Sequence, residues 1–161
     1  MDVSLASFVV LLHVVTAFFL VGGLIGRWIV LGRARRSTDL EEIDVLLPVA
    51  ERFEKIVIPS SGAILVFGLL AMWAQDRPLF TDGDYWLLVS LVLYLSLIPQ
   101  IPLIFLPRGR VFDAALADAR QRGSVTPELT AAFQDRGVAF ARTYEVVVVG
   151  IVVALMVLKP F

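Results

Sequence analysis

The chain has 161 residues, of which 58% are hydrophobic and 18% are charged, and its mean hydropathy is +0.84. This composition is too apolar for an ordinary soluble domain and indicates a membrane protein. The formal net charge of -1 excludes little, because in a membrane protein the information lies in how charge is distributed along the chain. The absence of cysteine excludes disulfides, cysteine-ligated zinc or iron–sulfur sites and thiol catalysis.

Four apolar runs follow one another along the chain. They cover about residues 5–31, 56–74, 86–106 and 144–158. Each approaches or exceeds the roughly 20 residues that a helix needs to cross hydrocarbon. Lipid offers the backbone no hydrogen bonds, and the runs are continuous rather than alternating, so helices are predicted rather than barrel strands. Asp2 stands where a secretory signal would carry Lys or Arg, so the first run is expected to be a retained span.

The Lys and Arg residues predict how these spans are oriented. Twelve of the 14 lie in or beside the first and third connections, residues 32–55 and 107–143. They are Arg27, Arg33, Arg35, Arg36, Arg52, Lys55, Arg108, Arg110, Arg120, Arg122, Arg136 and Arg142. Because cytoplasmic loops carry an excess of Lys and Arg, both connections are predicted to be cytoplasmic and both termini to lie outside.

The first connection has the pattern of a short amphipathic helix. Thr38 and Glu41 have the spacing of a capping box, and the apolar residues that follow recur at helical spacing. Pro48 is expected to end or kink this helix before the chain restarts into the second span.

The third connection predicts a second amphipathic helix and the start of a longer one. The turn 107–110 is followed by a helical pattern over 111–122, which is expected to end at Gly123. Thr126 and Pro127 then have the pattern of an N-cap and a first helical residue. One helix is expected from there through the fourth span. The predicted fold is therefore all-α: a single integral membrane domain over 1–161, in which four transmembrane helices form a bundle with short amphipathic cytoplasmic helices.

Gly22 and Gly26 form a small-xxx-small pair on the first span. Such pairs let two helices approach closely and gain dispersion contacts. The pair is expected to pack within the bundle or, alternatively, to form the contact of a homo-oligomer or of another membrane subunit.

Arg27 lies about one turn inside the first span, where a guanidinium is costly unless it reaches the headgroups or finds a partner. One interpretation is that Arg27 reaches the headgroups or pairs with Glu145 at the start of the fourth span. The other is a polar pocket of Arg27 and Gln100 that binds an anion, a lipid headgroup or a cofactor carboxylate. Gln100 lies between Pro99 and Pro102, whose missing backbone donors free carbonyls on the third span.

His13 is the only histidine and lies within the first span, which makes it a functional candidate. Counted from the cytoplasmic ends of the spans, Met72, Met156 and Tyr94 fall in the same outer half of the bilayer. An imidazole with thioethers suits Cu(I) or a b-type haem with His/Met axial ligands. The alternative is that His13 is satisfied by Tyr94, a serine or a backbone carbonyl, while the methionines only pack.

Other chemistry finds no support in the sequence. No nucleophile and base pair, phosphate loop or carboxylate cluster stands out, so hydrolytic and phosphoryl-transfer reactions are not expected. The arginines are explained by topology rather than by nucleic acid.

Several short motifs together resemble a bacterial family of predicted integral membrane proteins, domain of unknown function 2269. They are Leu12-His13, Gly22-Gly23, Arg27, the pattern from Ile58-Pro59 to Gly68-Leu69, and Pro107-Arg108-Gly109-Arg110. That family is similar to copper-resistance protein D and to the small haem-binding bacterial protoporphyrinogen oxidases. The resemblance implies a bacterial inner-membrane protein in which His13 ligates haem or a metal and Arg27 supports a charged group. The oxidases carry further polar residues in their spans, including a lysine, that have no counterpart here, and copper proteins usually have more His and Met.

Three hypotheses follow from these observations. The first is a protein that holds haem b, or otherwise copper, through His13 with Met72 or Met156 as a second ligand. The second is a non-catalytic accessory subunit or assembly factor of a larger membrane complex. The third is a small-solute or ion transporter, for which the few polar residues in the spans offer a sparse pathway.

Overall fold

The computed structural model describes residues 4–77 and 85–160, and every regular element within those ranges is helical. The elements in chain order are α1 (Leu5–Ala34), α2 (Leu40–Ala74), α3 (Tyr85–Leu95), the π-helix η1 (Ile101–Phe105), α4 (Leu106–Arg122), α5 (Pro127–Phe133) and α6 (Arg136–Leu158). The predicted all-α class is confirmed.

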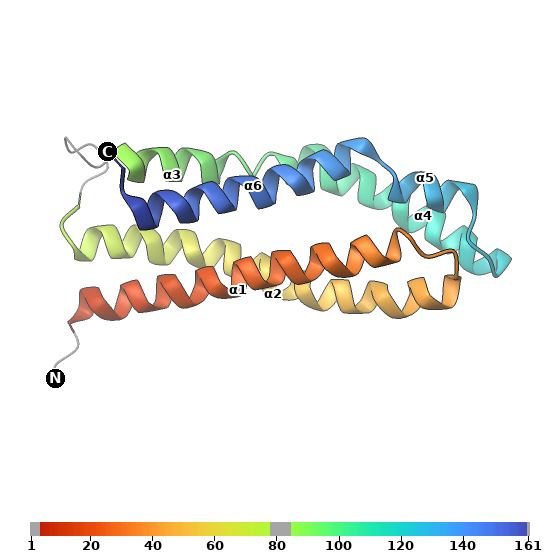
Figure 1. Cartoon of the computed structure of the whole chain (residues 1–161), viewed down its shortest axis with the longest axis horizontal. Helices are drawn as coiled ribbons and strands as arrows, with labels where there is room; N and C mark the ends of the chain where they lie inside the picture. The colour runs from red at the N-terminus through yellow and green to blue at the C-terminus, as the bar shows by residue number, and fades with distance from the viewer. Residues whose placement is uncertain (1–3, 78–84, 161) are drawn as a thin grey trace.

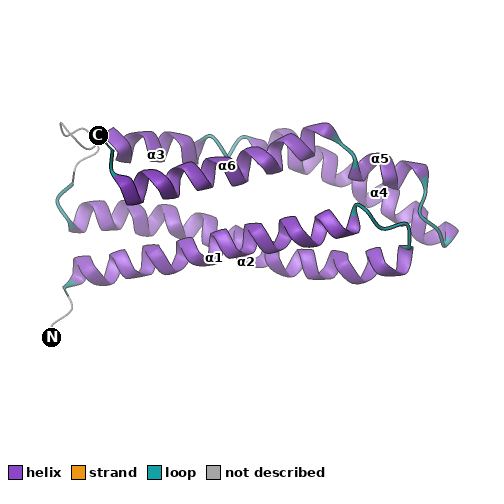
Figure 2. Ribbon diagram, viewed as in Figure 1, coloured by secondary structure: helices purple, strands orange, loops and turns teal. Residues whose placement is uncertain are grey.

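The helices lie roughly parallel to one long axis and form two pairs (Figures 1 and 2). The antiparallel helices α1 and α2 form one pair, and α3 and α6 form the other. The start of α1 and the end of α6 lie at the same end of the molecule, while α4 and α5 lie at the opposite end beside the α1–α2 turn. We call this opposite end, formed by residues 35–50 and 106–135, the polar end.

Among the described residues, three helical stretches are long and apolar enough to cross a membrane: Leu5–Ala34, Leu40–Ala74 and Pro127–Leu158. In their most apolar windows no more than 22% of the residues are buried within the fold. The other side chains are partly or fully exposed, which is the arrangement expected where lipid covers them. The predicted count of four transmembrane helices is not confirmed, because the third apolar run does not form one long helix.

That run, predicted as a span over 86–106, is broken in its middle. α3 ends at Leu95 after 11 residues, and the next backbone bonds are tight turns such as Leu97 N–H to Tyr94 O. Pro99 and Pro102 explain the break, because neither can donate a helical hydrogen bond and each disfavours helical geometry in the residue before it. The chain then resumes through η1, whose wider turn is visible where Leu106 N–H bonds to Ile101 O.

The first connection is not a separate short helix, contrary to the prediction. α2 runs for 35 residues from Leu40 to Ala74 and contains both Pro48 and Pro59. Pro48 therefore does not end the helix, and the predicted amphipathic segment and second span are one element. The predicted capping residue was also wrong by one position, since Asp39 rather than Thr38 is the N-cap and accepts from Glu41 N–H at 3.0 Å.

The third connection confirms two predicted boundaries and corrects two others. α4 ends at Gly123 and α5 begins after Thr126, as expected. The predicted turn 107–110 instead forms the first turn of α4. Pro107 fits there, because the first residues of a helix have no intrahelical N–H hydrogen bond to lose. The single helix expected from Pro127 onward is interrupted at Gln134, and Asp135 caps the new helix α6 by accepting from Val138 N–H at 2.9 Å.

Gly123 has φ +67° and ends α4 in the left-handed conformation. A side chain is strained there, so Gly123→Ala is expected to lower the free energy of unfolding by about 1 kcal/mol. Gly109→Ala is the matched control, because Gly109 lies inside the same helix with nothing within 4 Å of an added Cβ. Thermal unfolding of both variants in detergent measures the difference. A Gly123→Ala protein as stable as the Gly109→Ala protein would contradict this account.

Within residues 4–77 and 85–160, two separate clusters of buried side chains hold the helices together. At the polar end, α2, α4 and α5 bury Ile43, Ala115, Leu116, Ala119 and Leu129. Arg120 on α4 adds hydrogen bonds of 2.9 and 2.7 Å to Asp44 on α2. Nearer the termini, Leu20 and Leu24 of α1 pack with Val57 of α2 and Val149 of α6. The charged site described next lies between these two cores.

Candidate functional site

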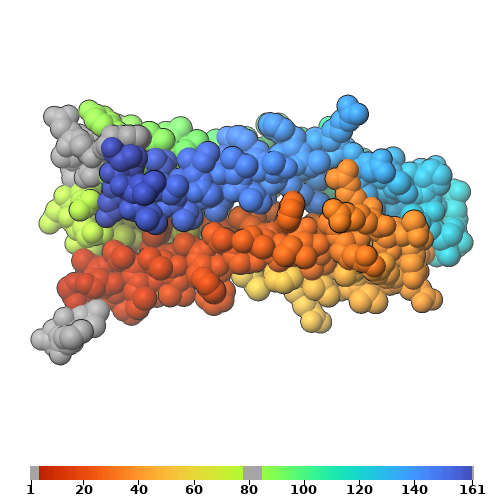
Figure 3. Space-filling model, viewed as in Figure 1, coloured from red at the N-terminus to blue at the C-terminus, as the bar shows by residue number. Residues whose placement is uncertain are grey.

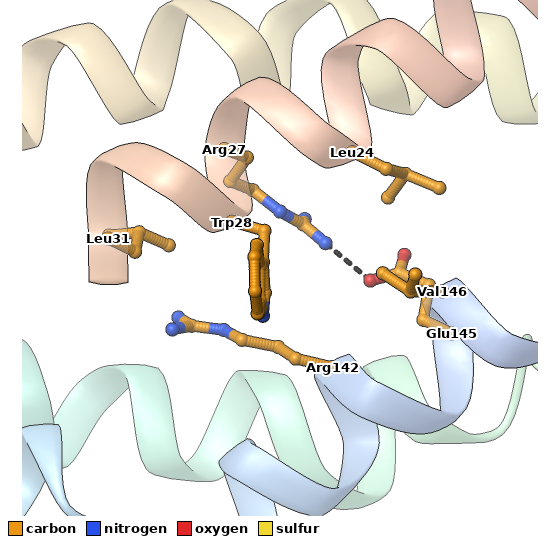
Figure 4. A pocket seen from close by; sticks show the side chains of 7 residues that line it. All are labelled: Leu24, Arg27, Trp28, Leu31, Arg142, Glu145 and Val146. Atoms are coloured by element: carbon orange, nitrogen blue, oxygen red, sulfur yellow. Dashed lines mark hydrogen bonds and ion pairs between the residues drawn. The ribbon is translucent and has the colours of Figure 1, made fainter. Parts of the chain in front are cut away.

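Arg27 of α1 is paired with a carboxylate on each of two neighbouring helices. It donates a hydrogen bond to Glu145 of α6, and its second terminal nitrogen, Nη1, lies 3.6 Å from Glu54 Oε1 of α2. The Arg27 and Glu145 side chains are only 11% and 18% exposed, whereas Glu54 is 52% exposed. Figure 4 shows the Arg27–Glu145 contact spanning the gap between α1 and α6.

Of the two interpretations of Arg27, the structure shows the ion pair with Glu145, and the pocket of Arg27 and Gln100 that binds an anion stays a prediction. The hydrogen bond of Arg27 goes to Glu145. The Gln100 Oε1 atom is buried and has no hydrogen-bond partner among the residues that the structure describes. Gln100 sits in the break between α3 and η1, where the proline kinks change the helical register on which its predicted position rested.

Sequence reasoning missed the role of Arg142, which it counted only as a topology residue. Arg142 lies one turn before Glu145 on α6 and lines a small cleft with Trp28 and Leu31 of α1. In Figure 4 its guanidinium extends away from Glu145, toward Leu31. The spacing of Arg142 and Glu145, three residues apart on one helix face, was the available signal.

The tight contact between α1 and α2 uses Gly23 and Gly26 rather than the predicted pair Gly22 and Gly26. A Cβ on Gly26 would lie 2.4 Å from the Phe53 ring, and one on Gly23 would lie 2.8 Å from Val57. Gly22 has nothing within 4 Å of an added Cβ and is exposed. Gly26 thus packs within the bundle as one alternative expected, whereas Gly22 faces away from the partner helix.

His13 and Tyr94 both bond to the backbone of α2. His13 Nδ1 lies 3.0 Å from the Ile64 carbonyl oxygen, and the Tyr94 hydroxyl donates to the Ser61 carbonyl at 2.7 Å. Gly68 makes room for the imidazole, since a Cβ there would lie 3.1 Å from His13 Cε1. One ring nitrogen of His13 is therefore satisfied by a backbone carbonyl, as one of the two predicted alternatives stated.

The two methionines lie at nearly the same height along the molecule as His13. Met72 follows Gly68 by four residues, about 6 Å along α2. Counted from the Arg27–Glu145 contact, His13 lies 14 residues along α1, about 21 Å, and Met156 lies 11 residues along α6, about 17 Å. Within the described ranges there is no group of three or more His, Asp or Glu that could hold a metal ion.

The same geometry separates His13 from Arg27. About 21 Å of helix lies between them, which is farther than the iron of one haem lies from its carboxylates. Arg27 is also already paired with two carboxylates. The two residues therefore belong to separate sites rather than to one cofactor pocket.

A comparison with protein-family models finds one that covers nearly the whole chain. The model described as "Predicted integral membrane protein (DUF2269)" matches residues 7–160. No curated protein and no solved structure matches the chain. The evidence on function therefore comes from the family and from the geometry above.

Proposed function

The chain belongs to the family of predicted integral membrane proteins (DUF2269) and is a multi-pass membrane protein, and we propose that it holds haem b, or otherwise a copper ion, through His13. The observation that carries the proposal is the hydrogen bond between His13 Nδ1 and the Ile64 carbonyl. A carbonyl oxygen can only accept, so Nδ1 carries the ring proton and Nε2 has a free lone pair. Metal-ligating histidines are held in this way by a second hydrogen bond.

The second ligand in this proposal is the thioether of Met72 or Met156. Both lie within about one helical turn of His13 in height, as their positions on α2 and α6 require. Met72 shares the face of α2 that carries Gly68, and its side chain tilts toward the helix N-terminus and thus toward His13. His/Met ligation suits haem b, and thioether with imidazole suits Cu(I). Tyr94 would act by holding α2 in place through Ser61 rather than as a ligand.

The proposal includes the orientation and the relatives expected from the sequence. The polar end would face the cytoplasm of a bacterial cell, both termini would lie outside the inner membrane, and the His13 site would lie near the outer surface. The proposal also takes the relation to copper-resistance protein D and to the haem-binding oxidases from the motif resemblance given above, and such a relation would fit this role. No reaction is part of the proposal.

The proposal is tested by the absorption spectrum and copper content of the protein purified from haem-supplied cells. The wild type is expected to show a Soret band, or otherwise to retain copper. His13→Asn is expected to abolish either signal, because its amide can still donate to Ile64 but is a poor ligand for these metals. Tyr94→Phe is the control, since it removes the bond to Ser61 and leaves Nε2 untouched. Absence of both haem and copper from the supplemented wild type would refute the proposal.

A second candidate function, an accessory subunit of a larger complex, is favoured by the surface around Gly22. This glycine is exposed with open space above it, and Phe18, Phe19 and Ile25 beside it are exposed as well. A notch in an apolar helix surface allows a second helix to approach closely. Co-purification of a partner in mild detergent, lost in Gly22→Leu, would support it, and a stable lone protein would count against it.

A further inference from the structure

Arg142 is a partly buried arginine whose guanidinium makes no direct ion pair or hydrogen bond in the described part of the chain. Arg27 is paired with Glu145 and Glu54, but no ion pair or hydrogen bond joins Arg142 to any described side chain. A guanidinium that is partly removed from water is costly unless an anion accompanies it. The carboxylates nearby, Glu54 and Glu145, attract Arg142 only from a distance, because both are engaged by Arg27 and the Arg142 guanidinium extends away from Glu145 (Figure 4).

The position of Arg142 corresponds to the boundary between the apolar and polar parts of the molecule. The apolar runs of α1 and α6 meet the charged cluster here, and Trp28 beside it is 60% exposed. Tryptophan with such exposure is typical of the headgroup zone of a membrane. A guanidinium at this boundary would lie level with the phosphates of the lipid headgroups.

The cleft beside Arg142 lies between α1 and α6. In the space-filling view α1 and α6 meet along a seam that opens into a narrow gap near the middle of the molecule (Figure 3). The cleft lined by Trp28, Leu31, Arg142 and their neighbours has a volume of about 10 Å³, which holds about one water molecule. A phosphate group would consequently bind at its mouth rather than inside it.

We infer that Arg142, with Trp28 and Leu31 beside it, forms a binding site for the phosphate group of an anionic phospholipid at the α1–α6 seam. Arginine presents a planar set of donors that matches two phosphate oxygens at once. The acyl chains would lie along the exposed apolar surfaces of α1 and α6, where Ile25, Val146 and Val153 are exposed. The inference does not depend on the His13 proposal, because the two sites are separate.

The test measures lipid binding by native mass spectrometry of the protein in a non-charged detergent. Phosphatidylglycerol, phosphatidylcholine and inorganic phosphate are added in separate titrations. The wild type is expected to bind phosphatidylglycerol more tightly than the other two, and Arg142→Gln to weaken this binding about tenfold, as expected for losing one charge-assisted contact. Arg142→Lys is expected to bind phosphatidylglycerol with an affinity between those of the wild type and Arg142→Gln, because lysine keeps the positive charge but loses the paired donor geometry.

Arg136→Gln is the matched control, since it removes the same charge from an exposed position on the same helix. If Arg136→Gln weakens the binding of phosphatidylglycerol as much as Arg142→Gln does, the lipid is attracted by positive charge in general, and the site at Arg142 is refuted. Unchanged binding in both Arg142 variants also refutes it. If inorganic phosphate binds as tightly as phosphatidylglycerol, the phosphate site stands and the lipid assignment is overturned. Should Arg142→Gln fail to fold, the comparison of Arg142→Lys with wild type decides the matter.

Discussion

Glu145→Gln is expected to lower the free energy of unfolding by about 3 kcal/mol or more, the cost of removing one partner from a buried ion pair. The Arg27 and Glu145 side chains are 11% and 18% exposed, so water cannot replace the lost carboxylate. Glu54 would remain 3.6 Å away, but it is 52% exposed and compensates only in part. Unfolding followed by circular dichroism in detergent measures the loss.

Two further variants test whether the loss of stability comes from breaking the buried pair or from removing a charge as such. The double variant Arg27→Met with Glu145→Leu is expected to recover most of the stability, because replacing both partners leaves no unpaired buried charge. Glu51→Gln breaks an exposed pair with Lys55, whose side chains are 63% and 72% exposed, and should leave stability unchanged. An E145Q protein as stable as wild type would mean that Arg27 reaches the headgroups instead.

Gly26→Val is expected to destabilise the protein by about 2 to 3 kcal/mol, because it places side-chain atoms where the Phe53 ring already lies. A Cβ at Gly26 would come within 2.4 Å of the ring, so α1 and α2 must separate or the ring must move. The same measurement of unfolding in detergent checks this prediction.

The control for Gly26→Val is Gly22→Val on the preceding turn. Gly22 has open space above it, so no loss of packing is expected there. Phe53→Ala combined with Gly26→Val should restore part of the stability relative to the sum of the two single variants, since the ring and the new side chain compete for one volume. Equal losses for Gly22→Val and Gly26→Val would contradict the packing of Gly26 against Phe53.

The sequence predicted the apolar runs and several helix ends because these depend on local chemistry. Gly123 and Thr126 mark boundaries through their own backbone and side-chain hydrogen bonds. Prolines were harder to interpret. Pro48 lies within a continuous helix, whereas Pro99 and Pro102 interrupt one. Whether a proline ends a helix depends on the neighbours that hold the two sides together, which periodicity does not reveal.

The candidate sites could be predicted only as residue types at similar depths. The pairing of Arg27 with Glu145 was among the expected alternatives because both are charged and occur at span ends. The pocket of Arg27 with Gln100 stays a prediction, and the break in the third run changes the register on which the depth of Gln100 was counted. Two details depend on which face of α1 meets α2. They are the contact of Gly23 rather than Gly22 with α2 and the bond of His13 to Ile64. A weakly one-sided apolar helix does not specify that face.

The length of α2 links the two ends of the molecule. Its 35 residues extend about 52 Å, whereas hydrocarbon is about 30 Å thick, so one uninterrupted helix reaches from Ile43 in the polar-end core to Ile64 beside His13. Pro48 and Pro59 lie between Asp44 and Ile64, and each removes a backbone hydrogen bond from the helix. A movement imposed where Asp44 meets Arg120 can therefore be taken up at either proline before it reaches the carbonyl that holds His13.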